Sequence, residues 1–141
     1  MKKKFSTKWK SSKQTRKQRK YRANAPKHLK RKMLSSNLSK ELRKKYKKRN
    51  ESLHKGDIVI VMRGKFKKKK GKISEINLSK IKVAVEGVQT QKRDGTKVNV
   101  FLDPSNLQIQ ELNTDDKRRM KRIKKEEIKE KNDAHKKTSN K

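Results

Sequence analysis

Positive charge is the feature of this sequence that most restricts how the chain can fold and where it can act. The 141 residues include 47 Lys and Arg against 14 Asp and Glu, which gives a formal net charge of +33. A compact monomer with that surplus repels itself strongly, so the sequence predicts a polyanionic partner. Nucleic acid fits because its phosphates are closely spaced and because binding releases counterions.

A membrane surface is the competing polyanion. No apolar run approaches the ~18 residues that a membrane-spanning helix needs, and no signal-peptide core follows the basic start. A protein that lies on a membrane needs a continuous amphipathic stripe, which is missing here. We therefore expect neither a membrane span nor a membrane-surface role.

Catalytic and metal-binding residues are not expected. There is no Cys, which excludes disulfides and thiolate zinc sites. His28, His54 and His135 are scattered, without a carboxylate at ligand spacing, and no motif brings together a nucleophile, a base and an orienting group. We expect no enzyme activity, no metal, no cofactor and no small-molecule substrate.

Charge and hydrophobicity divide the chain into three parts. Hydrophobic residues make up 27% of the chain and charged residues 43%, which is too polar for one core along the whole length. We predict a basic N-terminal extension with short helices at 1–53, a folded module at 54–112 and a charged C-terminal helix or tail at 113–141. Residues 1–55 alone contain 23 Lys and Arg against 2 acidic residues.

The middle part has the pattern of short β-strands. It contains one unbroken apolar run and several segments in which β-branched residues alternate with polar ones. Asp94-Gly95 is a hairpin signal, and other Gly and Pro residues separate the segments. The pattern predicts a mainly β fold, a small half-open barrel of marginal stability. The expected strands are 58–62, 72–77, 81–85, 98–102 and 107–109.

The flanking parts have helical signals instead. Pro26 opens a predicted helix that runs to residue 33, and Ser39 caps another with Glu41 in its first turn. Thr114, followed by two Asp residues, opens a C-terminal helix. The apolar positions of that last helix form no continuous stripe, so we expect it to lie on a surface, extend along RNA or fray. Those positions are Met120, Ile123 and Ile128.

One stretch carries a specific signal. Residues 55–77, KGDIVIVMRGKFKKKKGKISEIN, resemble the KOW motif. Gly56-Asp57 makes the turn into the first strand, and Gly71 is expected where the chain turns tightly into the second strand, with a positive φ or a close approach of RNA. Family members often have Gly where this chain has Lys68, so the loop here is stiffer and more basic.

The flanks decide which KOW family fits. A transcription elongation factor needs a mixed α/β domain before the motif, and residues 1–55 are too basic and too poor in apolar residues to form one. Residues 11–46 and the segment DPSNLQI at 103–109 resemble the archaeal and eukaryotic branch of the universal large-subunit ribosomal protein called twenty-four in bacteria and twenty-six in eukaryotes. The family usually has His where Asp103 stands. The resemblance covers roughly residues 10–112.

The resemblance implies more than the residues do by themselves. It implies an SH3-like KOW barrel and binding to the 5′ region of large-subunit rRNA. It also implies a part in early subunit assembly, a place near the exit of the polypeptide tunnel, neighbouring large-subunit proteins as partners, and residence in the cytoplasm on the ribosome.

The expected RNA contacts combine cations, glycines and aromatics. The run 67–70 either grips phosphate or is a solvated turn, and its place beside an aromatic and between two glycines favours phosphate. Trp9 and Phe66 are equally open to RNA and protein contact, whereas Tyr21, between two cations, favours RNA. We predict RNA contacts by Lys13, Arg16, Lys17, Arg19, Lys20, Tyr21, Arg22, Lys27, His28, Arg31, Lys32, Arg43, Arg63, Gly64, Lys65, Phe66, Lys67, Lys68, Lys69, Lys70, Gly71, Lys72 and Arg93.

Overall fold

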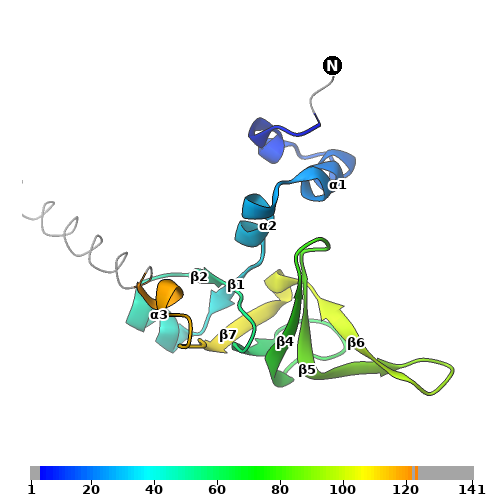
Figure 1. Ribbon diagram of the computed structural model, residues 1–141, viewed down its shortest axis with the longest axis vertical. Coiled ribbons are helices and arrows are strands. Elements are labelled where there is room, and N and C mark those ends of the chain that lie inside the picture. The colour runs from blue at the N-terminus through cyan, green and yellow to red at the C-terminus, as the bar shows by residue number, and fades with distance from the viewer. Residues whose placement is uncertain (1–3, 122, 124–141) are drawn as a thin grey trace, which may run out of the picture.

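The computed structural model describes residues 4–121 and 123 of the chain. A helical arm stands on a twisted sheet, and a long hairpin projects from the far end of that sheet (Figure 1). The elements are η1 (Thr7–Ser11), α1 (Thr15–Asn24), α2 (Lys27–Met33), β1 (Ser35–Leu38), α3 (Lys40–Tyr46), β2 (Asn50–Ser52), β3 (Ile58–Val61), β4 (Lys70–Asn77), β5 (Lys82–Gln91), β6 (Lys97–Leu102), η2 (Pro104–Asn106) and β7 (Leu107–Glu111).

The sheet confirms the mainly β, SH3-like barrel expected from the sequence. Its seven strands follow the order β2-β1-β7-β3-β4-β5-β6, and all five predicted strands are present as β3 to β7. β3 and β7 bury alternate apolar side chains, as the period of a strand requires. Buried apolar side chains of the sheet form one core that includes Val59, Ile73, Val83, Leu107 and Ile109.

Two strands come from residues before 54, where only helices were predicted. β1 pairs in parallel with β7, with Leu38 opposite Ile109, and antiparallel with β2. The Ser36 hydroxyl donates to the Leu107 carbonyl, and the Ser39 amide donates to the Ile109 carbonyl over 2.9 Å. The β propensity of the β1 sequence, SSNL, is too low to predict a strand. Tertiary pairing with β7 therefore decides its conformation.

The predicted short helices are confirmed. Pro26 is the N-cap of α2, and the Ser39 hydroxyl caps α3 by accepting a hydrogen bond from the Leu42 amide at 3.3 Å. The sequence missed α1 and η1, whose polar residues carry no apolar period. η1 and α1 make contacts with each other, and together with α2 they form the arm, residues 4–34, in Figure 1.

The C-terminal helix begins at residue 117 rather than 114. Asp116 caps it, because its Oδ1 accepts from the amides of Arg118 and Arg119 at 3.0 and 3.1 Å. Of the three expected alternatives, the described part of this helix follows the first, because it lies on the surface of the barrel. Ile123 is only 1% exposed and Arg119 only 2%. Ile128 lies outside the described residues.

A buried ion pair anchors that helix to the barrel. Arg119 Nη1 and Nη2 lie 2.6 and 3.0 Å from the two carboxylate oxygens of Asp57. The same carboxylate accepts from the amides of His54 and Asn113, and Arg119 Nη2 also donates to the Ser52 carbonyl at 2.8 Å. The two buried charges therefore compensate each other. Arg119 Nε has no hydrogen-bond partner among the described residues.

Candidate nucleic-acid interface

The arm presents half of the Lys and Arg residues that were predicted to contact RNA. The first forty residues contain no Asp or Glu, so no neighbouring carboxylate on this segment neutralises them. On α1, Arg16, Lys17, Arg19 and Lys20 are all exposed, and with ~100° of rotation per residue they fall within about half of the helix circumference. The result is a basic face that attracts a polyanion.

The arm is held in shape by a few contacts of its own. The rings of Phe5 and Tyr21 lie with their centroids 5.0 Å apart. The Gln18 amide donates to the Lys10 carbonyl at 3.1 Å and to the Ser12 carbonyl, which fastens η1 to α1. These contacts give the exposed cations a common frame although the helices are too short to be stable alone.

The loop between β3 and β4 has a different geometry from the one predicted. Its turn is made by Gly64, with φ 90°, and by Lys68, with φ 70°. The Lys68 amide donates to the Val61 carbonyl at 2.8 Å, and the Val61 amide donates to the Lys69 carbonyl at 2.9 Å, which closes the loop. A lysine in the left-handed region is strained, and this conformation explains why a glycine suits the position.

Gly71 is not the turn residue. It lies inside β4, opposite Val59, and it is absent from the positive-φ positions of the described chain. A Cβ added there would come within 2.5 Å of the Glu86 carbonyl oxygen and 2.8 Å of Val85 Cγ1. The expectation of a positive φ was therefore wrong, and the close approach is to β5 of the same barrel, which leaves the residue no role that requires RNA.

Three predicted contact residues are engaged within the protein. Tyr21 is 6% exposed, so its ring packs inside the arm and offers no open face to a base, contrary to the expectation. Arg43 Nε donates to the Leu38 carbonyl at 2.8 Å, and its Nη2 to the Asn37 side chain, which ties α3 to β1. Phe66 packs against the barrel core.

The lysines beside Phe66 stay accessible. Lys69 Nζ lies 5.3 Å from the centre of the Phe66 ring, a cation–π distance. Lys70 pairs with Glu111 across the sheet at 3.3 Å, with both side chains more than half exposed, so the pair contributes little stability. The whole run 67–70 is exposed, as a phosphate-contacting loop requires.

The β5–β6 hairpin carries the remaining predicted residue, Arg93, at its exposed tip. The predicted hairpin turn is confirmed, because Asp94 Oδ1 accepts from the Thr96 hydroxyl at 2.7 Å and from its amide at 3.0 Å. Those hydrogen bonds lower the pKa of Asp94 below its usual 3.8. In Figure 1 the tip is far from the arm, so Arg93 does not join the cations of α1 in one patch.

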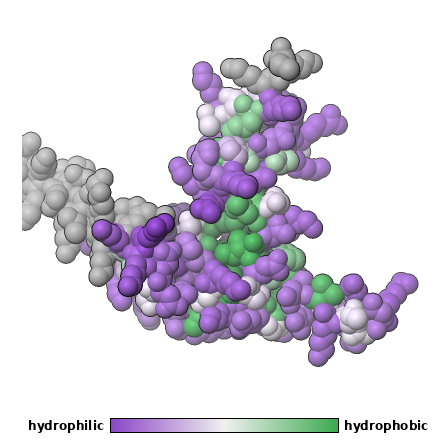
Figure 2. All heavy atoms as spheres, viewed as in Figure 1, coloured by the Kyte–Doolittle hydropathy of each residue, from purple (hydrophilic) through white to green (hydrophobic). Residues whose placement is uncertain are grey.

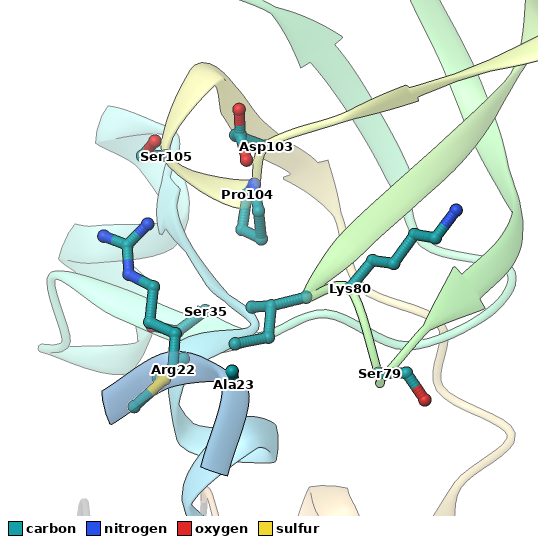
Figure 3. Close-up of a pocket in the computed structure, with 10 residues that line it drawn as sticks. Arg22, Ala23, Ser35, Ser79, Lys80, Asp103, Pro104 and Ser105 are labelled. Carbon is teal, nitrogen blue, oxygen red and sulfur yellow. The ribbon is translucent and has the colours of Figure 1, made fainter. Parts of the chain in front are cut away.

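A hollow of about 620 Å³ lies where the arm meets the barrel (Figure 3). Arg22 and Lys80 lie on opposite sides of it, and Ile81 takes the strained φ of 56°. Sequence reasoning found Arg22 and the segment around Asp103 but gave no signal that they meet. The lining consists of Arg22, Ala23, Met33, Ser35, Ser79, Lys80, Ile81, Asp103, Pro104 and Ser105.

The other predicted cations and glycines lie on the arm and in or after the β3–β4 loop. Exposed positions on the arm are Lys13, Arg16, Lys17, Arg19, Lys20, Arg22, Lys27, His28, Arg31 and Lys32; those in and after the β3–β4 loop are Arg63, Gly64, Lys65, Lys67, Lys68, Lys69, Lys70 and Lys72. Most of the surface around them is hydrophilic, with a hydrophobic patch near the junction of arm and barrel (Figure 2).

Within residues 4–121 and 123, no group of three His, Asp or Glu side chains is arranged to hold a metal ion. No helix in the same described residues is long and apolar enough to cross a membrane. The fold and its charge define a small SH3-like β-barrel protein with a strongly basic helical arm.

Two comparisons with known proteins identify the family to which this β-barrel protein is similar. The sequence model of the family that comprises the eukaryotic L26 and archaeal L24 ribosomal proteins matches residues 12–126. The chain is also similar to the large ribosomal subunit protein uL24 of Methanoculleus marisnigri (strain ATCC 35101 / DSM 1498 / JR1). The two are 46% identical over 112 residues, which is 79% of this chain and 93% of that protein.

The chain belongs to this family of eukaryotic L26 and archaeal L24 ribosomal proteins. The resemblance noted in the sequence, including its archaeal and eukaryotic branch, is thereby confirmed. As a member of the family it is a structural constituent of the large ribosomal subunit and not an enzyme.

Proposed function

We propose that this ribosomal protein binds the 5′ region of large-subunit rRNA, with the arm and the β3–β4 loop as its main contact surfaces. The observation that carries the proposal is the charge of the arm. It lies within a stretch of forty residues that has no carboxylate, and it is folded so that nearly all its cations are exposed. Such a surface has no anionic partner on its own segment and suits a phosphate backbone.

The three parts of the chain contribute differently to binding because their charges differ. Residues 1–53 supply the basic extension, residues 54–112 the barrel that positions it, and residues 113–141 a charged continuation. The relevant cations are mostly Lys, which acts as a point charge and does not read bases bidentately. Recognition therefore depends on the shape of a folded RNA, through its phosphates, minor groove and 2′-hydroxyls.

The wider role that we propose follows the family resemblance. The protein joins the subunit early in assembly, lies near the exit of the polypeptide tunnel beside other large-subunit proteins, and acts in the cytoplasm. Binding to the 5′ region, the part of the rRNA that is transcribed first, supports the early step.

Salt dependence tests the RNA contact. We expect the affinity for a 5′ fragment of large-subunit rRNA to fall on the order of 10³-fold between ~50 and ~200 mM salt if six or more phosphates are engaged. Changing Arg16 and Arg19 to Gln should lower the slope of log affinity against log salt by about 2, roughly 1 for each lost phosphate contact.

A matched control separates a defined interface from net charge. Lys40 and Lys44 on α3 are equally exposed and lie outside the proposed surfaces, so changing both to Gln should leave the slope unchanged. A flat salt response, or equal slopes for the two double variants, would contradict the proposed interface.

A further inference from the structure

An exposed tryptophan stands on the arm. Trp9, the single Trp of the chain, is 38% exposed in η1, and it is one of three large hydrophobic side chains exposed in the described residues, with Met62 and Val98. An aromatic ring of this size usually contributes to a core or an interface. The barrel core does not include it.

The arm holds this ring in a defined place. The Gln18 amide spans from α1 to the carbonyls of Lys10 and Ser12, on either side of the end of η1. The Phe5–Tyr21 ring contact fixes the start of the chain against α1 as well. When the arm is folded, these contacts give Trp9 a defined place beside α1.

Two lysines share the hollow beside the ring. Trp9, Lys17 and Lys20 line a space of about 310 Å³. Lys17 and Lys20 are three residues apart on α1 and therefore lie on the same side of the helix. Because no acidic residue occurs in the first forty positions, this segment offers the two ammonium groups no anion of its own.

We propose that Trp9 is a stacking platform for an unpaired rRNA base, and that Lys17 and Lys20 hold the phosphate of the same nucleotide or its neighbour. A flat π face with two flanking cations is the combination by which proteins bind single-stranded nucleic acid. The positive charges of Lys17 and Lys20 beside the ring favour RNA over the apolar side chain of a neighbouring protein. This inference rests on the proposed function and adds a base-contacting site to an interface otherwise made of phosphate contacts.

The single Trp makes the site directly observable. Titrating the full chain with the 5′ rRNA fragment should quench Trp fluorescence along the same binding curve that an independent measurement, such as filter binding, reports. Trp9→Leu keeps an apolar side chain but removes the π face, and its affinity should fall roughly 5- to 150-fold, as for the loss of one base stack. Trp9→Phe keeps a smaller π face and should lose less.

The salt slope separates stacking from charge. Trp9→Leu should leave the slope of log affinity against log salt unchanged, whereas Lys17→Gln and Lys20→Gln should each lower it by about 1. Circular dichroism of the free variants checks that helix content is retained.

Each outcome decides the proposal. Quenching with a weakened Leu variant and an unchanged slope supports it. Binding of the fragment without quenching, or with Trp9→Leu equal to the parent, overturns the stacking site and leaves the proposed function standing. If the parent fails to bind the fragment at all, the proposed function fails first and the inference fails with it.

Discussion

The barrel and the arm are built from the same basic chain, yet different forces shape them. In the barrel, five strands turn apolar side chains into one core, with Val59, Val83 and Leu107 fully buried. In the arm, α1 buries only Tyr21, and α1 and α2 have ten and seven residues, below the length at which an isolated helix is stable. Burial of apolar surface stabilises the barrel, whereas the arm depends on a few local contacts.

The barrel and the arm also differ in how their charged side chains are paired. The barrel and the C-terminal helix bury one complete ion pair, Asp57 with Arg119, whose carboxylate is satisfied by two further backbone amides. The arm has cations without any carboxylate in its own sequence. A region whose cations have no carboxylate in their own segment is suited to an external polyanion.

The largest effect on stability is expected from the buried ion pair. Arg119→Ala leaves the Asp57 carboxylate buried without its counter-ion and should lower the free energy of unfolding by about 3–5 kcal/mol. Denaturant unfolding measures this loss. The exposed neighbour Arg118 is the matched control, and Arg118→Ala should change stability by less than about 0.5 kcal/mol. Equal effects of the two variants would show that the C-terminal helix does not anchor to the barrel.

A smaller loss is expected where β4 and β5 approach each other. Gly71→Ala places a methyl group against the Glu86 carbonyl and Val85, and the resulting shift should cost about 1–3 kcal/mol in the free protein. Lys68→Gly relieves a left-handed φ and should leave the unfolding free energy within about 0.5 kcal/mol of the parent or raise it. Thermal unfolding without RNA tests both. A Gly71→Ala variant that melts like the parent would refute the steric interpretation.

Removing one buried side chain from the barrel and one from the arm should show the difference in stability between the two regions. Leu107→Ala in the barrel core should cost about 2–5 kcal/mol, whereas Tyr21→Ala in the arm should change global unfolding by less than about 0.5 kcal/mol, because the arm opens before the barrel unfolds. Hydrogen exchange on the free protein should protect β3 to β5 and leave residues 4–34 nearly open, and rRNA binding should slow exchange in the arm. Strong protection of α1 without RNA would contradict this division.

The smallest effect concerns the cap of the C-terminal helix. The hydrogen bond from the Arg119 amide, followed by that from Arg118 and the nearby charge of His54, lowers the pKa of Asp116 below its usual 3.8. A lowered folded-state pKa stabilises the fold above the unfolded value and loses that contribution as pH falls through the folded value. The parent should therefore lose a slight additional stability below pH 3.8 that Asp116→Asn does not lose. If the melting temperatures of the parent and Asp116→Asn depended on pH in the same way, the Asp116 cap would make no contribution to stability.

Much of the barrel was predictable because its strands follow local rules. The unbroken apolar run at 58–62 predicted β3, the motif at 55–77 predicted β4, and β-branched residues that alternate with polar ones predicted β5 to β7. Asp94-Gly95 predicted the hairpin, and Ser39 predicted its helix. β1 and β2 were not predictable, since SSNL and NES form strands only through pairing with β7 and with each other. α1 was missed because its sequence, TRKQRKYRAN, has too few apolar residues to give a detectable apolar period.

For the candidate site, composition alone predicted a polyanionic partner, and the motif at 55–77 together with its flanks predicted the family. Which aromatic ring is open, however, was decided by packing. Tyr21 lies between two cations in sequence and is buried against Phe5, whereas Trp9 is exposed beside Lys17 and Lys20.

The sequence by itself determined the charge, the barrel strands and the family, because these depend on composition and on patterns of neighbouring residues. Three features were decided only by the tertiary structure. Asp57 pairs with Arg119, sixty-two positions away, and residue 71 must be Gly because a Cβ there would clash with β5. Arg22 and the segment at Asp103 line the same hollow. Each of these depends on the distance between residues far apart in the chain, and that distance is set when the sheet closes and the helices dock.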